Sequence, residues 1–333
     1  MKGHIVSENK ILQNPTLAIV FILIGMLGIS LNDMLIKFLS GGYPLHQMVF
    51  TRSLIGIGFS LALVQLEGGW SILKTDQPGL HVLRATFLVI ANLTFFTALA
   101  VLPLAEATAV FFVAPLMITL LSIPILGEKV GPMRIGAVLV GFAGVIIMTR
   151  PWESGAERTI SLWVYVLPIA AAFTYALNNV MTRYLGAKSK ASAMAVYIQS
   201  AFIFVSIIFW LIAGDGRFTE GVENESLLFL FRAWVWPEGH DLWLFAGLGL
   251  NAALIGYCLG QAYRIADAAT VAPFEYVGLP LAIFWGWVIW GELPGLPVVF
   301  GILLILGSGL FVFLREKQKN RMVVRGKHVH RRY

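Results

Sequence analysis

The feature of this 333-residue chain that most limits its fold is a succession of apolar stretches, each long enough to cross a lipid bilayer. A helix needs roughly 20 apolar residues to cross about 30 Å of hydrocarbon. Ten stretches reach that length, at residues 16–38, 46–66, 79–101, 103–126, 131–150, 161–183, 191–213, 241–263, 268–291 and 295–315. Continuous apolar runs such as 137–148 lack the alternating polarity of transmembrane β-strands. The sequence therefore predicts an all-α membrane protein with ten transmembrane helices.

Composition supports this class and excludes several others. Only 13% of the residues are charged, against roughly 25% in soluble domains. A single Cys excludes a disulfide framework and a Cys-based zinc site. The six His residues show no metal-ligand spacing backed by carboxylates. No Gly-x-x-x-x-Gly-Lys-Ser/Thr or Gly-x-Ser-x-Gly sequence is present. We therefore expect no metal, no cofactor, no ATP-driven step and no catalytic residue.

The distribution of Lys and Arg predicts the orientation of the chain. If residues 1–15 form a cytoplasmic N-terminal segment, three quarters of the 24 Lys and Arg residues lie on the cytoplasmic side. Ten spans place residues 316–333, a basic tail, on that side as well. Such a tail is attracted to anionic lipid, so we expect contact with the bilayer rather than with nucleic acid. The sequence thus predicts a multi-pass protein of the cytoplasmic (inner) membrane with both termini cytoplasmic.

Two stretches of the chain resemble each other. Residues 102–128 and 265–292 each begin with a small-acid-small tripeptide, contain prolines and end in Gly-Glu. Each is followed by a short loop and a glycine-rich last helix. We therefore predict two five-helix repeats, 16–150 and 161–315, with an outward insertion at 214–240. Since five spans is an odd number, the repeats would be inverted in the membrane around a central cavity, as in alternating-access transporters.

Several of these motifs also resemble a known family. They are Phe96–Ala100 with Pro103-Leu104, Pro115–Glu128, and Val271–Tyr276 with Gly291-Glu292. Over residues 16–315 the chain is similar to the EamA-type ten-helix branch of the drug/metabolite transporter superfamily. The insertion at 214–240 departs from the family pattern.

The resemblance implies a secondary transporter, not an enzyme, working by alternating access across the cytoplasmic membrane. The expected substrate is a small amphipathic metabolite, for example riboflavin-like, S-adenosylmethionine-like or amino-acid-like. Coupling to protons is expected if the transport is coupled. The alternative is a membrane enzyme or a flippase acting on lipid-linked substrates.

Ionisable groups at bilayer depth are costly, which makes them functional candidates. Glu275 follows a proline in the ninth span and lies beside Tyr276. It is expected either to bind a cationic group or exchange a proton, or to be a buried carboxyl held by neighbours. Asp33 and Lys37 share one face of the first helix, and Arg52 lies two turns into the second. Together these three predict either a local salt-bridge network or an anion-binding, gating or coupling cluster.

Further polar and aromatic residues at bilayer depth are expected to contact the substrate. Individually, each of them is also explained by helix packing. The set comprises Asn92, Asn178, Asn179, Tyr257, Gln261, Tyr276 and Phe112. Glycines in the last helix of each repeat allow close helix contact, and one use of that contact is a homodimer interface.

Overall fold

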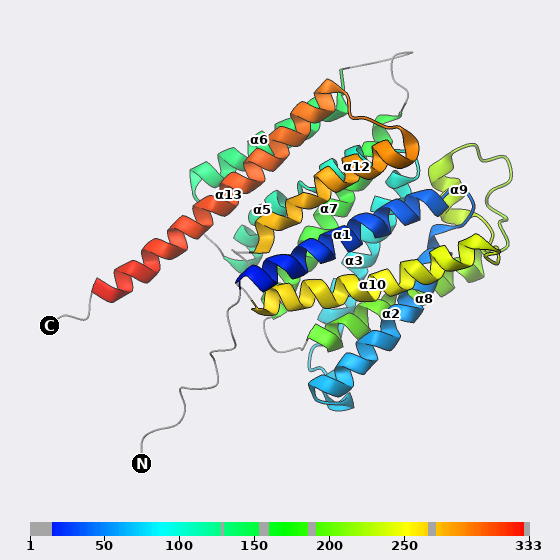
Figure 1. The fold of residues 1–333 in the computed structure, drawn as a ribbon, viewed down its shortest axis with the longest axis horizontal. Coiled ribbons are helices and arrows are strands. Elements are labelled where there is room, and N and C mark those ends of the chain that lie inside the picture. The colour runs from blue at the N-terminus through cyan, green and yellow to red at the C-terminus, as the bar shows by residue number, and fades with distance from the viewer. Residues whose placement is uncertain (1–14, 128–129, 153–159, 186–190, 266–270, 330–333) are drawn as a thin grey trace.

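A computed structural model describes residues 15–127, 130–152, 160–185, 191–265 and 271–329 of the chain (Figure 1). Nine helices in these residues are long and apolar enough to cross a membrane, and Phe274–Trp290 adds a shorter apolar helix. The predicted all-α, ten-helix membrane protein is thereby confirmed. Its elements are α1 (Pro15–Leu39), α2 (Leu45–Glu67), η1 (Trp70–Leu73), α3 (Pro78–Leu99), α4 (Leu104–Phe111), α5 (Ala114–Leu126), α6 (Pro132–Thr149), α7 (Leu162–Leu185), α8 (Ala191–Ala213), α9 (Glu225–Phe231), α10 (His240–Ile265), η4 (Ala272–Val277), α12 (Gly278–Trp290) and α13 (Leu296–Val329).

Two of the predicted spans are interrupted helices. The span predicted at 103–126 consists of α4 and α5, which are separated at residues 112–113 just before Pro115. The span predicted at 268–291 consists of the 3₁₀ helix η4 and the α-helix α12. Broken helices leave backbone groups unpaired, and within a membrane they are tolerated where they are buried in protein or line a cavity.

Both interrupted spans end in the same way. Gly127 and Gly291 adopt left-handed conformations with φ of 69° and 68°. A glycine in this conformation terminates a helix without the steric cost that a side chain would add. The Gly-Glu motif identified in the sequence is therefore a helix stop followed by an acidic residue.

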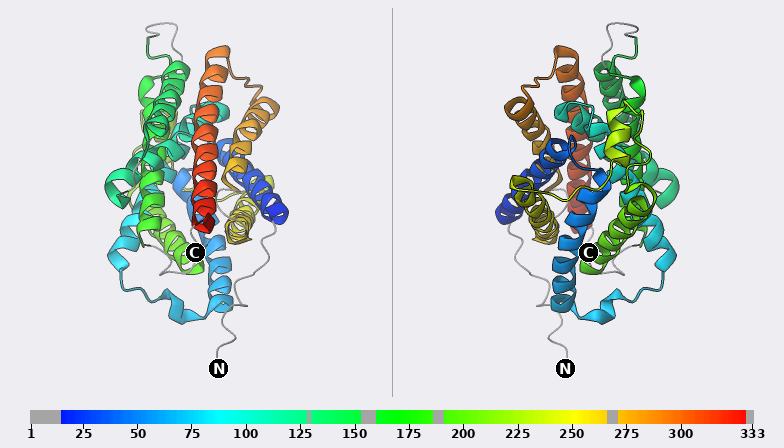
Figure 2. Two further views of the ribbon diagram at one scale, coloured as in Figure 1. Left: turned by 90° about the vertical axis from the view of Figure 1, so that its left-hand side faces the viewer. Right: turned by 90° about the vertical axis from the view of Figure 1, so that its right-hand side faces the viewer.

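The long helices pack in pairs that join residues 16–150 to residues 161–315. The main pairs are α1 with α10, α2 with α8, α3 with α7 and α6 with α13. Figure 1 shows α6 and α13 side by side along one edge of the bundle. In Figure 2, with α13 in front, α1, α10 and α12 lie on one side and α7 on the other. Helices from both parts of the chain therefore surround the centre.

Glycine explains the close packing of α6 on α13. A Cβ atom placed on Gly144 would lie 2.8 Å from the carbonyl oxygen of Gly301, and one on Gly301 would lie 2.6 Å from that of Gly144. Gly141 approaches Ser308 in the same interface, so the two helices are antiparallel. These glycines are used within one chain, whereas Gly136 and Gly307 have nothing within 4 Å. The expected homodimer remains a prediction.

The insertion at 214–240 lies against one end of the bundle. Asn224 caps the start of α9, because its side chain accepts a hydrogen bond from the backbone N–H of Leu227. The side-chain amide of Gln47 donates to the carbonyl of Val235 at 2.6 Å and accepts from its N–H at 3.2 Å. Ser226 donates to the carbonyl of Thr97, at the end of α3. The insertion is therefore anchored to α2 and α3.

Tyr43 ties the connection between α1 and α2 to the start of α10. Its hydroxyl donates to the Asp241 carboxylate at 2.6 Å. This hydrogen bond favours the protonated phenol and raises the pKa of Tyr43 above its usual value. Figure 1 shows the start of α1 and the end of α13 at the opposite end of the bundle.

Candidate functional site

The helices enclose a central cavity of about 420 Å³. That volume is within the usual range for a small-molecule site. The cavity is lined by residues of α1, α2, α3, α4, α5, α7, α8, α10, η4 and α12. Most of these are apolar or aromatic. The polar minority includes Asn32, Asp33, Arg52, Asn92, Gln199 and Glu275.

Five of the residues expected at the site line this cavity. They are Asp33, Arg52, Asn92, Phe112 and Glu275. Asp33 and Arg52 come from the first two helices, and Glu275 comes from η4, inside the second interrupted span. The break between η4 and α12 therefore lies where the ninth span borders the cavity.

The structure places Tyr257 and Gln261 away from the cavity. The face of α10 that borders the cavity carries Ala252, Ile255 and Leu259. Tyr257 lies on another face, is 47% exposed and contacts the edge of Phe21. Since α10 is apolar around most of its circumference, its sequence gave little indication of which face turns inward.

Asn178, Asn179 and Tyr276 lie outside the cavity lining. The Asn179 amide donates to the carbonyl of Tyr175 at 2.8 Å, within its own helix. Asn178 is buried, and its side-chain oxygen accepts no hydrogen bond from the described residues. Tyr276 packs with its ring 5.4 Å from Phe112 and its hydroxyl against Gly309 of α13. Tyr276 thus supports the cavity wall from behind Phe112.

Arg52 is held at the cavity by neutral groups. It is 9% exposed, and its Nη1 and Nη2 donate to the amide oxygens of Asn32 at 3.2 Å and Asn92 at 3.4 Å. The Asn32 amide nitrogen in turn donates to the Asp33 carboxylate at 3.1 Å. Within the described part of the chain, no carboxylate lies within the 4.0 Å ion-pair distance of Arg52. Asn32 therefore stands between the guanidinium and the carboxylate.

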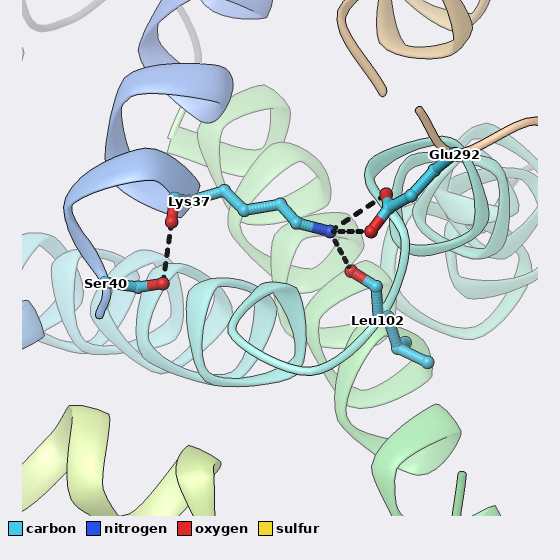
Figure 3. Close-up of polar contacts among 4 residues, drawn as sticks. All are labelled: Lys37, Ser40, Leu102 and Glu292. Atoms are coloured by element: carbon cyan, nitrogen blue, oxygen red, sulfur yellow. Dashed lines mark hydrogen bonds and ion pairs between the residues drawn. The ribbon is translucent and has the colours of Figure 1, made fainter. Parts of the chain in front are cut away.

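Lys37 is not part of that group, so the expected salt-bridge network of Asp33, Lys37 and Arg52 does not form. Instead, Lys37 Nζ donates to the carbonyl of Leu102 at 2.7 Å and to the Glu292 carboxylate at 3.2 and 3.3 Å (Figure 3). Its ammonium also lies 5.0 Å from the ring centroid of Trp290.

The Lys37 contacts join three segments at one end of the bundle. They are the end of α1, the connection between α3 and α4, and the connection between α12 and α13. Glu292 was identified in the sequence only as half of a Gly-Glu motif. The motif marks a position directly after a helix stop, but it does not show which cation, 255 residues away, will contact the carboxylate.

Glu106 has a structural partner near this end. Tyr165, in the first turn of α7, donates a hydrogen bond to the Glu106 carboxylate at 2.6 Å. Glu106 and Glu292 both border a second, smaller cavity. Among the described residues, no three His, Cys, Asp or Glu side chains are grouped so that they could hold a metal ion.

Comparison with known proteins supports the family resemblance seen in the sequence. Residues 16–150 match the EamA-like transporter family. This match and the transporter names of the relatives support the resemblance of the chain to the drug/metabolite transporter superfamily. It is 29% identical to a riboflavin transporter of Vibrio cholerae, over 84% of this chain and 86% of that protein. It is 26% identical to an S-adenosylmethionine uptake transporter of Rickettsia prowazekii, over 93% of this chain and 97% of that protein.

A solved crystal structure shares the fold of this chain. The two superpose with a TM-score of 0.59 over 90% of this chain and 98% of the other, at 21% sequence identity. At that identity the likeness concerns the fold alone. The site is therefore argued from this chain's own residues.

Proposed function

We propose that this chain is a secondary transporter that moves a small amphipathic metabolite across the cytoplasmic membrane by alternating access. The observation that carries this proposal is the central cavity, which holds Asp33, Arg52 and Glu275 among mostly apolar walls. Charged side chains at bilayer depth are costly and mark transport pathways. Relatives named as transporters of riboflavin and S-adenosylmethionine, both small molecules with a planar ring system, support a solute of this kind.

Alternating access requires two halves that exchange roles, and we propose residues 16–150 and 161–315 as inverted repeats. The helix pairs support this, because the first helix of each half packs on the third helix of the other. Residues 30–39, SLNDMLIKFL, also resemble residues 176–185, ALNNVMTRYL. These segments end the first helix of each half, α1 and α7. Inverted repeats around a central site allow one half to rock against the other.

We assign a gating role to the contact of Lys37 with Glu292 and Leu102. These groups hold α1 to two connections at one end of the bundle, which the Lys and Arg distribution makes the outer end. Opening the cavity to the outside would separate these segments and break the ion pair. The exposed fraction of the Glu292 side chain, 32%, leaves its carboxylate accessible to water when the pair breaks.

Glu275 is the group we propose for proton exchange or for binding a cationic part of the solute. It lines the cavity in an interrupted helix, and Phe112, between α4 and α5, lines the same cavity and packs on Tyr276. Asp33 and Arg52, from α1 and α2, are the other described residues of the lining with an acidic or basic side chain. A carboxylate at this position can take up a proton or release it as the local charge changes.

Uptake by proteoliposomes containing the purified full-length protein tests the proposal. The panel contains riboflavin, S-adenosylmethionine and amino acids, each with and without a pH gradient. We expect at least one solute to accumulate and Glu275→Gln to lower its uptake by at least about tenfold, because interactions with a charged group contribute about 1.5–3 kcal/mol. Glu223→Gln, in the exposed insertion, is the matched control.

One outcome would contradict the transport function, and another would contradict only the role of Glu275. Transfer of labelled lipids with no movement of any soluble solute would identify a flippase instead. Wild-type uptake by a folded Glu275→Gln protein would remove Glu275 from the mechanism while leaving transport intact.

A further inference from the structure

Arg52 has more hydrogen-bond donors than the protein uses. A guanidinium carries five N–H donors. The described residues accept two of them, through the amide oxygens of Asn32 and Asn92. The side chain borders the central cavity, so the remaining donors have an acceptor only if one enters that cavity. A nearly buried cation with unused donors is a binding group for an anion.

The guanidinium is also held in a fixed orientation. Asn32 of α1 and Asn92 of α3 accept its hydrogen bonds. The ring centroids of Phe96 and Phe202 lie 5.8 and 5.7 Å from its Cζ atom. Arg stacks on aromatic faces and binds carboxylates through two parallel hydrogen bonds. A guanidinium restrained by two amides and two rings loses little conformational freedom when a planar carboxylate binds.

Asp33 supplies the opposite charge beside Arg52. Its carboxylate borders the same cavity and accepts one hydrogen bond from the Asn32 amide. Because Asn32 bridges the two charged groups, Asp33 and Arg52 do not neutralise each other by direct contact. The cavity therefore presents one cation and one anion about one amide group apart. A ligand with a carboxylate and an ammonium group on the same carbon has the complementary arrangement.

We propose that Arg52 and Asp33, spaced by Asn32, form the subsite that binds the amino-acid head group of a zwitterionic solute. Arg52 binds the carboxylate and Asp33 binds the ammonium group. The apolar body of the solute occupies the aromatic part of the cavity, toward Phe111 and Phe112. A solute whose charges balance loses less hydration free energy on entering the membrane interior than a solute with a net charge. This inference rests on the transport function proposed above and specifies its substrate class.

The first test uses the unmodified protein and matched ligands. Binding of L-phenylalanine, L-methionine and L-tryptophan is measured on the full-length protein in detergent, by thermal shift and by equilibrium binding. The comparison ligands for phenylalanine are 3-phenylpropanoate, which lacks the ammonium group, phenethylamine, which lacks the carboxylate, and the methyl ester. We expect at least one amino acid to bind at least about tenfold more tightly than its counterparts lacking either charge.

The second test assigns each charge to a residue. Arg52→Gln should lower the affinity for the amino acid at least about tenfold while leaving the affinity for phenethylamine unchanged. Asp33→Asn should remove the preference for a ligand with an ammonium group over 3-phenylpropanoate. Arg217→Gln and Asp215→Asn, an exposed ion pair in the insertion, are the matched controls. Arg52→Lys keeps the charge but loses the bidentate geometry, so we expect an intermediate affinity.

The outcomes separate this proposal from the transport function. If no amino acid binds, or if ligands lacking one charge bind equally well, the zwitterion subsite is wrong, whether or not other solutes are transported. If the two substitutions alter affinity for all ligands alike, their role is structural and the assignment is wrong. Failure of transport for every solute in the uptake panel would instead overturn the proposed function.

Discussion

Lys37, near the end of α1, and Glu292, directly after α12, form an ion pair in which Nζ lies 3.2 Å from Oε2. The pair joins α1 to the connection between α12 and α13. Lys37 also donates to the carbonyl of Leu102, so a single ammonium holds two connections. Neither residue is part of the lining of the central cavity.

Replacing Lys37 by Met should destabilise the protein by about 1–3 kcal/mol, because Glu292 and the carbonyl of Leu102 both lose a donor. The partial exposure of Glu292 keeps the cost toward the lower value. Thermal unfolding in detergent measures the effect. Lys74→Met, at an exposed position after η1, should leave the melting temperature unchanged.

If the ion pair of Lys37 and Glu292 acts as a gate, its loss should open the central cavity to the outside. Lys37→Met should increase labelling of a cysteine introduced at Leu104, which lines the cavity, by a membrane-impermeant thiol reagent applied outside. The double exchange Lys37→Glu with Glu292→Lys should restore part of the protection. Equal labelling in wild type and Lys37→Met would mean that the ion pair is structural and does not control access.

The close contact between α6 and α13 leaves no room for a larger side chain at Gly144. Gly144→Val should destabilise the protein by about 1–3 kcal/mol, because the new side chain meets the carbonyl oxygen of Gly301 and the two backbones must separate. Gly136→Val, in the same helix with nothing within 4 Å, is the control. Differential scanning fluorimetry compares the two. A similar loss for both variants would mean that α6 tolerates no β-branched residue, rather than that it needs a glycine at the α13 contact.

Gln47 is expected to stabilise the attachment of the insertion to α2. Gln47→Ala removes both hydrogen bonds to Val235, which should destabilise that attachment by about 1–2 kcal/mol. Hydrogen exchange of the Val235 amide should then become faster, while exchange in α6 stays the same. Gln65→Ala, an exposed position in the same helix, is the control. Unchanged exchange at Val235 in Gln47→Ala would show that other contacts hold the insertion.

The sequence predicted the helices better than it predicted their contacts. All ten spans are found near their expected positions, because the length of an apolar run is a local property that the bilayer thickness fixes. Asp33, Arg52 and Glu275 were singled out in the sequence because charge at bilayer depth is rare, and all three line the cavity. The breaks at residues 112–113 and at the start of α12 were not predicted as breaks, since proline alone does not show how a helix is interrupted.

The remaining residues could not be placed because their neighbours come from distant parts of the chain. Glu292 meets Lys37 only when α12 and α1 are brought together, and Asn32 acquires its role only when Arg52 of α2 lies beside it. The faces of Tyr257 and Gln261 were also undetermined. In lipid, a helix that is apolar all round carries no pattern that distinguishes its protein side from its lipid side.

A side chain at Gly309, which is not part of the cavity lining, is expected to weaken solute binding in the cavity. The Tyr276 hydroxyl lies where a side chain at Gly309 would extend, so Gly309→Val should displace Tyr276 and remove the support of Phe112 in the cavity wall. We expect solute affinity to fall by about tenfold, the effect of losing contacts worth about 1.4 kcal/mol. Gly307→Val, in the same helix with nothing within 4 Å, should bind as wild type does. Equilibrium binding of a transported solute compares them, and equal affinity in both variants would show that Phe112 holds its position without Tyr276.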